Sequence, residues 1–179
     1  MNKLLLQIVI RQVGTAHSFI PLYQSLCKKG LKNKIEILCL TTHEAHLLLK
    51  QKKIPYTPVS SFKDAQKYLN KGIRLLFTGS SDFFKDDHLF WDWAKKNQIP
   101  SWAYVEQWIG FALRFTSSKN SKNKFNCTPD KVLVIDSLAQ KEIIQEGLDP
   151  KKIMIAGNPA FDIFTEIKTN ALSFNQLDD

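Results

Sequence analysis

The chain has 179 residues, 44% of them hydrophobic, which is enough for one domain with a sizeable core. Its 25 Lys and Arg residues outnumber 17 Asp and Glu residues, so the net charge of +8 either favours anionic partners or marks an ordinary Lys-rich surface. No apolar run approaches the ~20 residues of a membrane span, and three cysteines without C-x-x-C spacing favour a cytoplasmic protein.

Short apolar runs alternate with longer amphipathic stretches along the chain. The apolar runs predict strands at residues 4–10, 35–40, 56–59, 74–78, 101–105, 131–135 and 153–156. The amphipathic stretches predict helices at 17–29, 44–52, 62–69, 86–97, 138–146 and 160–167. Because near-continuous apolar strands are typical of parallel sheets, we expect an α/β fold, a doubly wound, mostly parallel Rossmann-like sheet. The domain is expected to span residues 1–168, with 169–179 as a tail or linker.

The first candidate site lies after the first predicted strand, because ligands of open parallel sheets bind beyond the carboxyl ends of the strands. Gly14 and Thr15 form a small-residue turn there, and glycine lets the backbone approach a ligand closely. His17 can donate a hydrogen bond to a sugar or phosphate, or act as a general base. The alternative is that His17 only caps the following helix.

Two more candidate segments follow the fourth and fifth predicted strands. Gly79 and Ser80 offer backbone amides and a hydroxyl. Glu106, followed by Gln107, is a carboxylate at the tip of a buried strand, where it is costly unless it is solvated or paired. Such a glutamate can act as a general acid or base or hold sugar hydroxyls. A salt bridge from Glu106 to Arg114 or to a lysine is the alternative.

The remaining motifs exclude several kinds of chemistry. The sequence has no G-x-G-x-x-G fingerprint, no Walker loop and no Cys or His cluster with zinc spacing, so we expect no cofactor and no metal. Lysines are scattered and are not interleaved with aromatic residues, so no specific nucleic-acid partner is expected. Asn158 lies in the turn after the last predicted strand. It either only helps to fix that turn or is part of a hinge.

Several segments together resemble a known family. Gly14 to His17 followed by Pro21 resembles the first loop of GT-B glycosyltransferases. Residues 78–81, 91–94 and 99–108 look like the middle of the same lobe. Residues 129–136 and 155–162 are similar to the closing segments of UDP-N-acetylglucosamine 2-epimerase-like and polysaccharide-biosynthesis glycosyltransferase-like proteins. The resemblance covers residues 4–165.

This resemblance implies the N-terminal, acceptor-side lobe of a GT-B enzyme that transfers a hexosyl or N-acetylhexosaminyl group in cell-surface polysaccharide or glycolipid biosynthesis. A second lobe or partner subunit would hold the nucleotide-sugar donor, and without it the chain would be inactive. The acceptor would be a sugar or a lipid-linked molecule. The resemblance implies catalytic roles for His17 and Glu106. The implied substrate-binding residues are Gly14, Thr15, Gly79, Ser80, Gln107 and Asn158.

Two alternatives remain open. Epimerases carry an arginine at the position of Ala16 and an aspartate at that of Ser80, so only Glu106 retains their signature; a UDP-sugar epimerase or hydrolase-like enzyme is one alternative. The other is a non-catalytic binding module that docks a partner subunit, or the anionic inner face of the membrane as a peripheral protein. An exposed apolar face around Trp108, Phe111 and Phe115 would support it.

Overall fold

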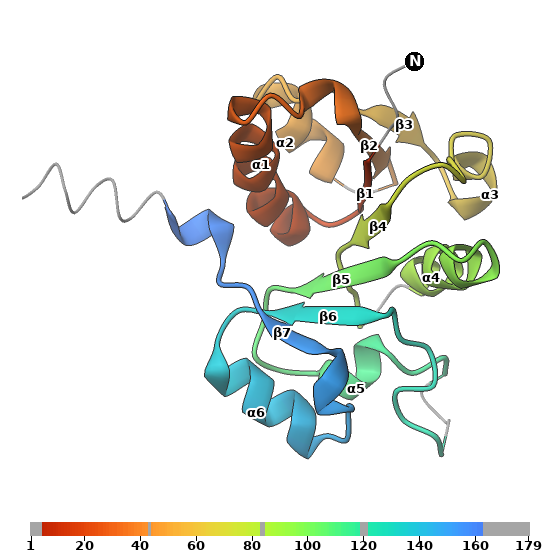
Figure 1. Ribbon diagram of the computed structural model, residues 1–179, viewed down its shortest axis with the longest axis vertical. Helices are drawn as coiled ribbons and strands as arrows, with labels where there is room; N and C mark the ends of the chain where they lie inside the picture. The colour runs from red at the N-terminus through yellow and green to blue at the C-terminus, as the bar shows by residue number, and fades with distance from the viewer. Residues whose placement is uncertain (1–4, 43, 83–84, 119–121, 163–179) are drawn as a thin grey trace, which may run out of the picture.

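A seven-stranded, fully parallel sheet organises the protein (Figure 1). The computed structural model describes residues 5–42, 44–82, 85–118 and 122–162. The strand order is β3-β2-β1-β4-β5-β6-β7, so the chain reverses its direction of travel across the sheet between β1 and β4. The strands are β1 (Leu6–Ile10), β2 (Ile35–Leu40), β3 (Thr57–Val59), β4 (Leu75–Thr78), β5 (Ser101–Val105), β6 (Lys131–Val134) and β7 (Ile153–Ile155). The predicted doubly wound Rossmann-like fold is confirmed.

Helices lie on both faces of the sheet (Figure 1). Alternate strand residues define the faces: Tyr104 of β5 packs in the core beneath α1 and α2, whereas Ala103 and Val105 pack in the core on the opposite face. The helices of the first face are α1 (Val13–Lys28) and α2 (Ala45–Gln51). Those of the second are α3 (Phe62–Ala65), α4 (Asp86–Lys96), α5 (Phe111–Arg114) and α6 (Ser137–Gln145). Three short 3-10 turns complete the described elements: η1 (Lys32–Lys34), η2 (Pro150–Lys152) and η3 (Pro159–Phe161).

Three helices differ from the sequence-based prediction. Helix α1 begins at Val13 rather than at His17, α3 ends at Ala65 rather than at residue 69, and the short helix α5 was not predicted. The end of α3 has a clear cause: buried Gln7 on β1 donates to the Tyr68 carbonyl at 2.9 Å and accepts from the Asn70 amide at 3.4 Å. These bonds hold the backbone of residues 68–70 outside a helix.

The predicted helix at 160–167 and the predicted domain boundary at 168/169 fall largely outside the described residues. Within them, η3 follows β7 and packs against α1. Asn158 caps this turn, because its Oδ1 accepts a hydrogen bond from the Ala160 amide at 3.0 Å.

Candidate functional site

The ends of β1, β4 and β5 meet at the carboxyl edge of the sheet. A Cβ atom on Gly79 would stand 2.4 Å from Oγ1 of Thr15, so the residue after β4 must be glycine for α1 to approach it. A Cβ atom on Gly14 would stand 3.2 Å from Oε1 of Glu106, which follows β5. The first turn of α1 therefore lies directly against both neighbouring strand ends.

These contacts explain why α1 begins earlier than predicted. Thr15 and Ala16 are buried in the first helical turn, with Thr15 against Gly79. Burial of these side chains outweighs the low helix propensity of Gly14. His17 consequently lies in the second turn and does not cap the helix; residue 12 occupies the N-cap position. The carbonyl of His17 also lacks the usual hydrogen bond from residue 21, because Pro21 has no backbone N–H.

Glu106 is the side chain at this edge that is best suited to acid–base chemistry. Its Oε2 is buried and has no hydrogen-bond partner among the described residues. Burial raises the pKa of the Glu106 carboxyl, and the positive charge of Arg114 opposes this only in part. The salt bridge considered from the sequence is not formed in the described structure, because the Arg114 guanidinium donates elsewhere.

Arg114 instead links the segments that follow β4 and β5 by hydrogen bonds. Its Nη1 donates to the Ser80 carbonyl at 2.8 Å, and its Nη2 donates to Oε1 of Gln107 at 2.5 Å. The His88 ring contacts the Arg114 carbonyl at 2.7 Å and fixes the end of α5. Ser80 is itself only 1% exposed and donates to the Tyr104 carbonyl at 3.1 Å. Thr15, Gly79 and Ser80 are thus internal contacts of this edge, and their binding to a substrate stays a prediction.

A second cation and two acidic residues of α4 lie close to one another at this edge, and one of them, Asp87, interacts electrostatically with Glu106. Arg11, directly after β1, is 3% exposed and pairs with Asp86 of α4 at 2.5 Å. The adjacent Asp87 is buried, and burial raises its pKa to about 7, against the attraction of Arg11. Nearby Asp86 and Glu106 raise it further. We call Gly14, Glu106, Arg114, Arg11 and Asp87 the strand-end cluster.

His17 and Asn158 lie to one side of this cluster. His17 is exposed and lines a hollow of about 470 Å³ between α1, α2 and η3, together with Gln24 and Lys28. Its position three residues after Gly14 makes the two neighbours on the helix surface. Asn158 accepts from Oγ of Ser18 at 3.2 Å and so joins η3 to α1. The structure brings Gly14 and Glu106 together, and it places His17 on the adjoining surface.

Sequence reasoning missed Arg11 and Asp87 as members of the cluster and considered Arg114 only as a partner of Glu106. Arg11 did carry a signal, since it ends the apolar run of the first strand and must lie at the same edge as Glu106. Asp87 carried none, because acidic residues in the first turn of a helix are common for reasons of the helix dipole.

Three apolar side chains between Gln107 and Arg114 in the sequence are exposed. Trp108 is 40%, Ile109 is 74% and Leu113 is 48% exposed, and Nε1 of Trp108 donates to Oδ2 of Asp136 at 2.8 Å. Phe111 and Phe115, in contrast, are completely buried in the core beneath α5 and α6, so they form no part of the exposed apolar face that would support a binding module. Their burial follows from α5, which turns both rings inward.

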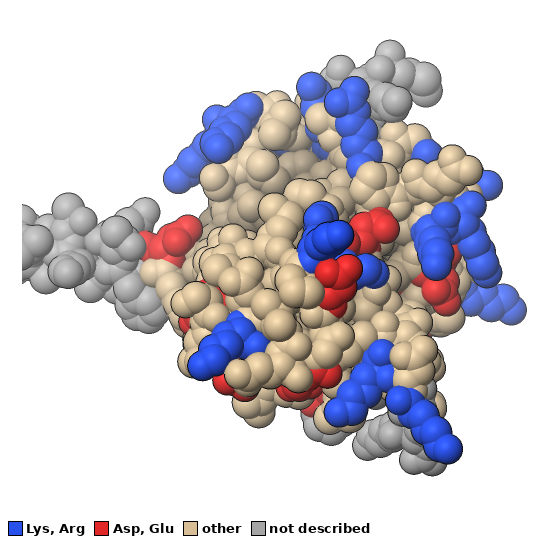
Figure 2. Space-filling view, turned by 60° about the horizontal axis from the view of Figure 1, so that its bottom comes forward, with Lys and Arg blue, Asp and Glu red and all other residues tan. Residues whose placement is uncertain are grey.

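Charge is distributed without a continuous basic surface on the face shown in Figure 2, where Lys and Arg side chains stand in separate groups with Asp and Glu among them. Over the described ranges, no three His, Cys, Asp or Glu residues are grouped so that they could hold a metal ion. The same residues include no helix with the length and apolarity needed to cross a bilayer.

Comparison with known proteins gives matches only at the level of structure. No family profile and no curated protein matches the sequence. A solved UDP-N-acetylglucosamine 2-epimerase is similar with a TM-score of 0.63 and 17% identity, over 90% of this chain and 48% of that one. The 2-epimerase of Neisseria meningitidis bound to UDP-GlcNAc is similar with a TM-score of 0.59 and 14% identity, over 97% of this chain and 55% of that one. HepE of Anabaena in complex with UDP is similar with a TM-score of 0.60 and 13% identity, over 86% of this chain and 44% of that one.

These matches confirm the fold expected from the sequence resemblance, that of one lobe of UDP-N-acetylglucosamine 2-epimerase-like GT-B structures. The chain spans about half the length of the structures it matches. Two of those proteins, HepE and the Neisseria meningitidis 2-epimerase, were solved with UDP or a UDP-sugar bound.

Proposed function

We propose that this chain is the acceptor-side half of a nucleotide-sugar-dependent glycosyltransferase, with Glu106 as its acid–base group. The buried, unpartnered Oε2 of Glu106 carries the proposal, because a carboxylate oxygen without an internal partner is available to a ligand hydroxyl. Its raised pKa brings the group closer to neutrality, where a general acid or base works best.

The surroundings of Glu106 suit a sugar. Gly14 leaves open the space beside Oε1 that a side chain would fill, so a ring can approach the carboxylate there. Arg114 keeps a positive charge near a site where negative charge would develop on an attacking oxygen. In transfer, Glu106 takes the proton of the acceptor hydroxyl while that oxygen bonds to the anomeric carbon and the nucleoside diphosphate departs.

His17 and a second lobe complete the proposal. His17, exposed beside Gly14, supplies a hydrogen-bond donor to the acceptor or to the departing diphosphate. The donor is held by a second lobe, as the resemblance to GT-B enzymes implies, and the exposed Trp108 and Ile109 border the edge at which that lobe would meet the cluster.

Epimerase chemistry is the second candidate, because 2-epimerases are among the similar structures. Two residues weaken it in this chain. Ala16 stands where the epimerase pattern has an arginine and is completely buried, and Ser80 stands where it has an aspartate and is 1% exposed. Neither position offers a charged group, so Glu106 would have to act without the arginine and the aspartate of the epimerase pattern.

The test is an amide NMR titration of the chain with octyl β-N-acetylglucosaminide as acceptor probe and UDP as donor probe. We expect the glycoside to shift the signals of Gly14, Glu106 and Gln107, and Glu106→Gln to remove these shifts. Glu142→Gln, on α6, is the matched control and should leave them unchanged. Shifts confined to other parts of the molecule, or none at millimolar glycoside, would contradict an acceptor site at Glu106.

A further inference from the structure

Trp108 is an exposed tryptophan whose ring is held in place by its polar edge. Its Nε1 donates to Oδ2 of Asp136 at 2.8 Å, and Oδ1 of the same carboxylate accepts from the Ala139 amide at the start of α6. Even so, 40% of Trp108 stays exposed. Among the described residues, Trp91 and Trp102 pack against other aromatic rings, whereas no such ring contact involves Trp108. An oriented aromatic surface is therefore left open to a ligand.

The side chain of Gln107, the preceding residue, is oriented as well. Its Oε1 accepts a hydrogen bond from Nη2 of Arg114 at 2.5 Å. A guanidinium group can only donate, so the oxygen of the Gln107 amide faces Arg114 and the amide nitrogen lies on the other side. Gln107 is exposed, and none of the described residues accepts a hydrogen bond from this nitrogen. Gln107 therefore offers its N–H donors to a ligand, next in the chain to the indole of Trp108.

Glu106 and Trp108 reach towards different neighbours of β5. A Cβ atom on Gly14, in the first helical turn after β1, would stand 3.2 Å from Oε1 of Glu106, whereas Trp108 binds Asp136, which follows β6. In the strand order β1-β4-β5-β6, the positions after β1 and β6 are three strand spacings apart, or about 14 Å. A single sugar ring is too short to contact the Glu106 carboxylate and the Trp108 indole together.

The charge beside Trp108 favours a neutral ligand. Hydrogen bonds from the Ala139 amide and from Trp108 hold the pKa of the Asp136 carboxyl below its usual range, so this group is negatively charged at neutral pH. It would repel the phosphates of a nucleotide placed against the indole. A pyranose is neutral, and it presents C–H groups on one face and oxygens at its rim. Its face can pack on the indole of Trp108 while its rim accepts a hydrogen bond from Gln107.

We propose that Trp108 and Gln107 form a second sugar subsite, which binds the pyranose next to the one that reacts at Glu106. The inference rests on the proposed glycosyltransferase function and sharpens it, because it makes the acceptor a chain of at least two sugar units. Trp108 stacks on the C–H face of the second ring, and Nε2 of Gln107 donates to an oxygen at its rim. Both residues adjoin the edge at which a second lobe would meet the cluster, where an acceptor held between two lobes would lie.

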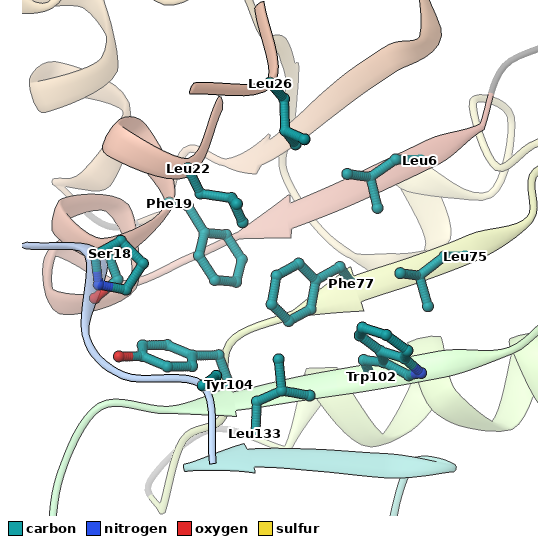
Figure 3. A pocket seen from close by; sticks show the side chains of 12 residues that line it. Leu6, Ser18, Phe19, Leu22, Leu26, Leu75, Phe77, Trp102, Tyr104 and Leu133 are labelled. Carbon is teal, nitrogen blue, oxygen red and sulfur yellow. The ribbon is translucent and has the colours of Figure 1, made fainter. Parts of the chain in front are cut away.

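Trp102 lines a different surface, an apolar groove of about 240 Å³ on the sheet face that α1 only partly covers. Its floor and one wall are formed by Phe77, Trp102 and Tyr104 of the sheet and by Phe19 and Leu22 of α1 (Figure 3). We call this the sheet-face groove. Because its lining consists almost entirely of aliphatic and aromatic side chains, it suits an alkyl chain better than a sugar, whose hydroxyls would lose their water there. Trp102 therefore serves as the control tryptophan.

An NMR titration of the chain with methyl β-N-acetylglucosaminide and with the disaccharide N,N′-diacetylchitobiose, neither of which carries a long alkyl chain, tests the subsite. We expect the disaccharide to bind about tenfold more tightly, because stacking on an aromatic ring is worth about that much. Only the disaccharide should shift the indole N–H signal of Trp108. Equal affinities, with shifts at Glu106, would overturn the subsite and leave the proposed function standing. Binding of neither sugar would overturn both.

Substitutions separate stacking by Trp108 from its hydrogen bond to Asp136. Trp108→Ala should remove the gain of the disaccharide and leave the affinity for the monosaccharide unchanged. Trp108→Phe keeps an aromatic ring without the hydrogen bond and should retain part of the gain, and Trp102→Phe, in the sheet-face groove, should retain all of it. Equal losses in Trp108→Ala and Trp108→Phe would contradict stacking, and a loss in Trp102→Phe alone would assign the second ring to the groove.

Discussion

The strand-end cluster and the sheet-face groove are built from the same strands, yet one is charged and the other is apolar. Tyr104 points into the groove, Val105 points into the opposite core, and Glu106, one residue beyond β5, reaches the edge. A charge within the strand would lose its water on either face. On β1 and β5, the charged groups of the cluster therefore lie just past the strands, where Arg11 and Glu106 stand.

The largest expected difference between the two regions is the effect of pH on the free energy of unfolding, which Asp87 in the strand-end cluster should cause. Its pKa is raised by burial to about 7 in the folded protein, so folding binds a proton between about pH 4 and pH 7, and the protein loses stability as the pH rises through that window. Asp87→Asn stays neutral throughout. From pH 4 to pH 8 the variant should therefore gain up to about 4 kcal/mol in free energy of unfolding relative to the unsubstituted chain.

Urea unfolding of both proteins across this range measures the effect. Asp149→Asn, at the exposed N-cap of η2, is the matched control and should show no such divergence. Parallel pH curves for Asp87→Asn and the unsubstituted chain would mean that Asp87 is not the buried acid described here.

The next effect tests the close approach at the strand ends. Gly79→Ala brings a Cβ atom to 2.4 Å from Oγ1 of Thr15, so α1 must shift, and we expect a loss of roughly 3 kcal/mol in free energy of unfolding. Gly30→Ala meets no atom within 4 Å and carries only the strain of its positive φ, about 1 kcal/mol. Equal losses in chemical denaturation would show that the Thr15 contact is not the constraint.

The groove should respond differently from the cluster. Trp102 is half-buried, with its ring edge-on to Phe77, and Trp102→Ala should cost about 2 kcal/mol. Because the groove floor carries no ionisable group that changes charge between pH 5 and pH 8, this cost should be the same at both values. A pH-dependent cost, measured by urea unfolding, would mean that the groove and the cluster are energetically coupled.

The smallest effect separates binding from stability at Gly14. A Cβ atom there would stand 3.2 Å from Oε1 of Glu106, while alanine improves the helix, so stability should hold or rise. Binding of the acceptor glycoside should fall about tenfold, or about 1.4 kcal/mol. NMR titration and urea unfolding of the same Gly14→Ala sample check both parts. Unchanged affinity would remove Gly14 from the binding surface.

Much of the fold could be predicted from the sequence, because parallel strands covered on both faces are short apolar runs. The apolar runs at residues 4–10 and 101–105 predicted β1 (Leu6–Ile10) and β5 (Ser101–Val105) with little error in their bounds. The start of α1 could not be predicted, since it depends on Thr15 packing against Gly79, which lies far away in the sequence. The early end of α3 depends in the same way on the side chain of Gln7.

The candidate site, like the fold, was predictable only where local sequence decides its position, and not where packing between distant residues does. The rule that ligands bind past the strand ends selected Gly14, Gly79 and Glu106, and the structure places these residues around one edge. The rule could not show that Thr15 and Ser80 would be buried, because burial there depends on how closely α1 and α5 approach the strand ends. It also could not show that Arg114 would bind Gln107 and Ser80 rather than Glu106.

The most direct test of the account is the titration of the Glu106 carboxyl carbon, followed by ¹³C NMR with and without octyl β-N-acetylglucosaminide. We expect the pKa of Glu106 to lie above the ordinary glutamate value of about 4.3 and to change when the glycoside binds. An ordinary pKa that is insensitive to the glycoside would contradict the assignment of Glu106 as the acid–base group of a sugar site.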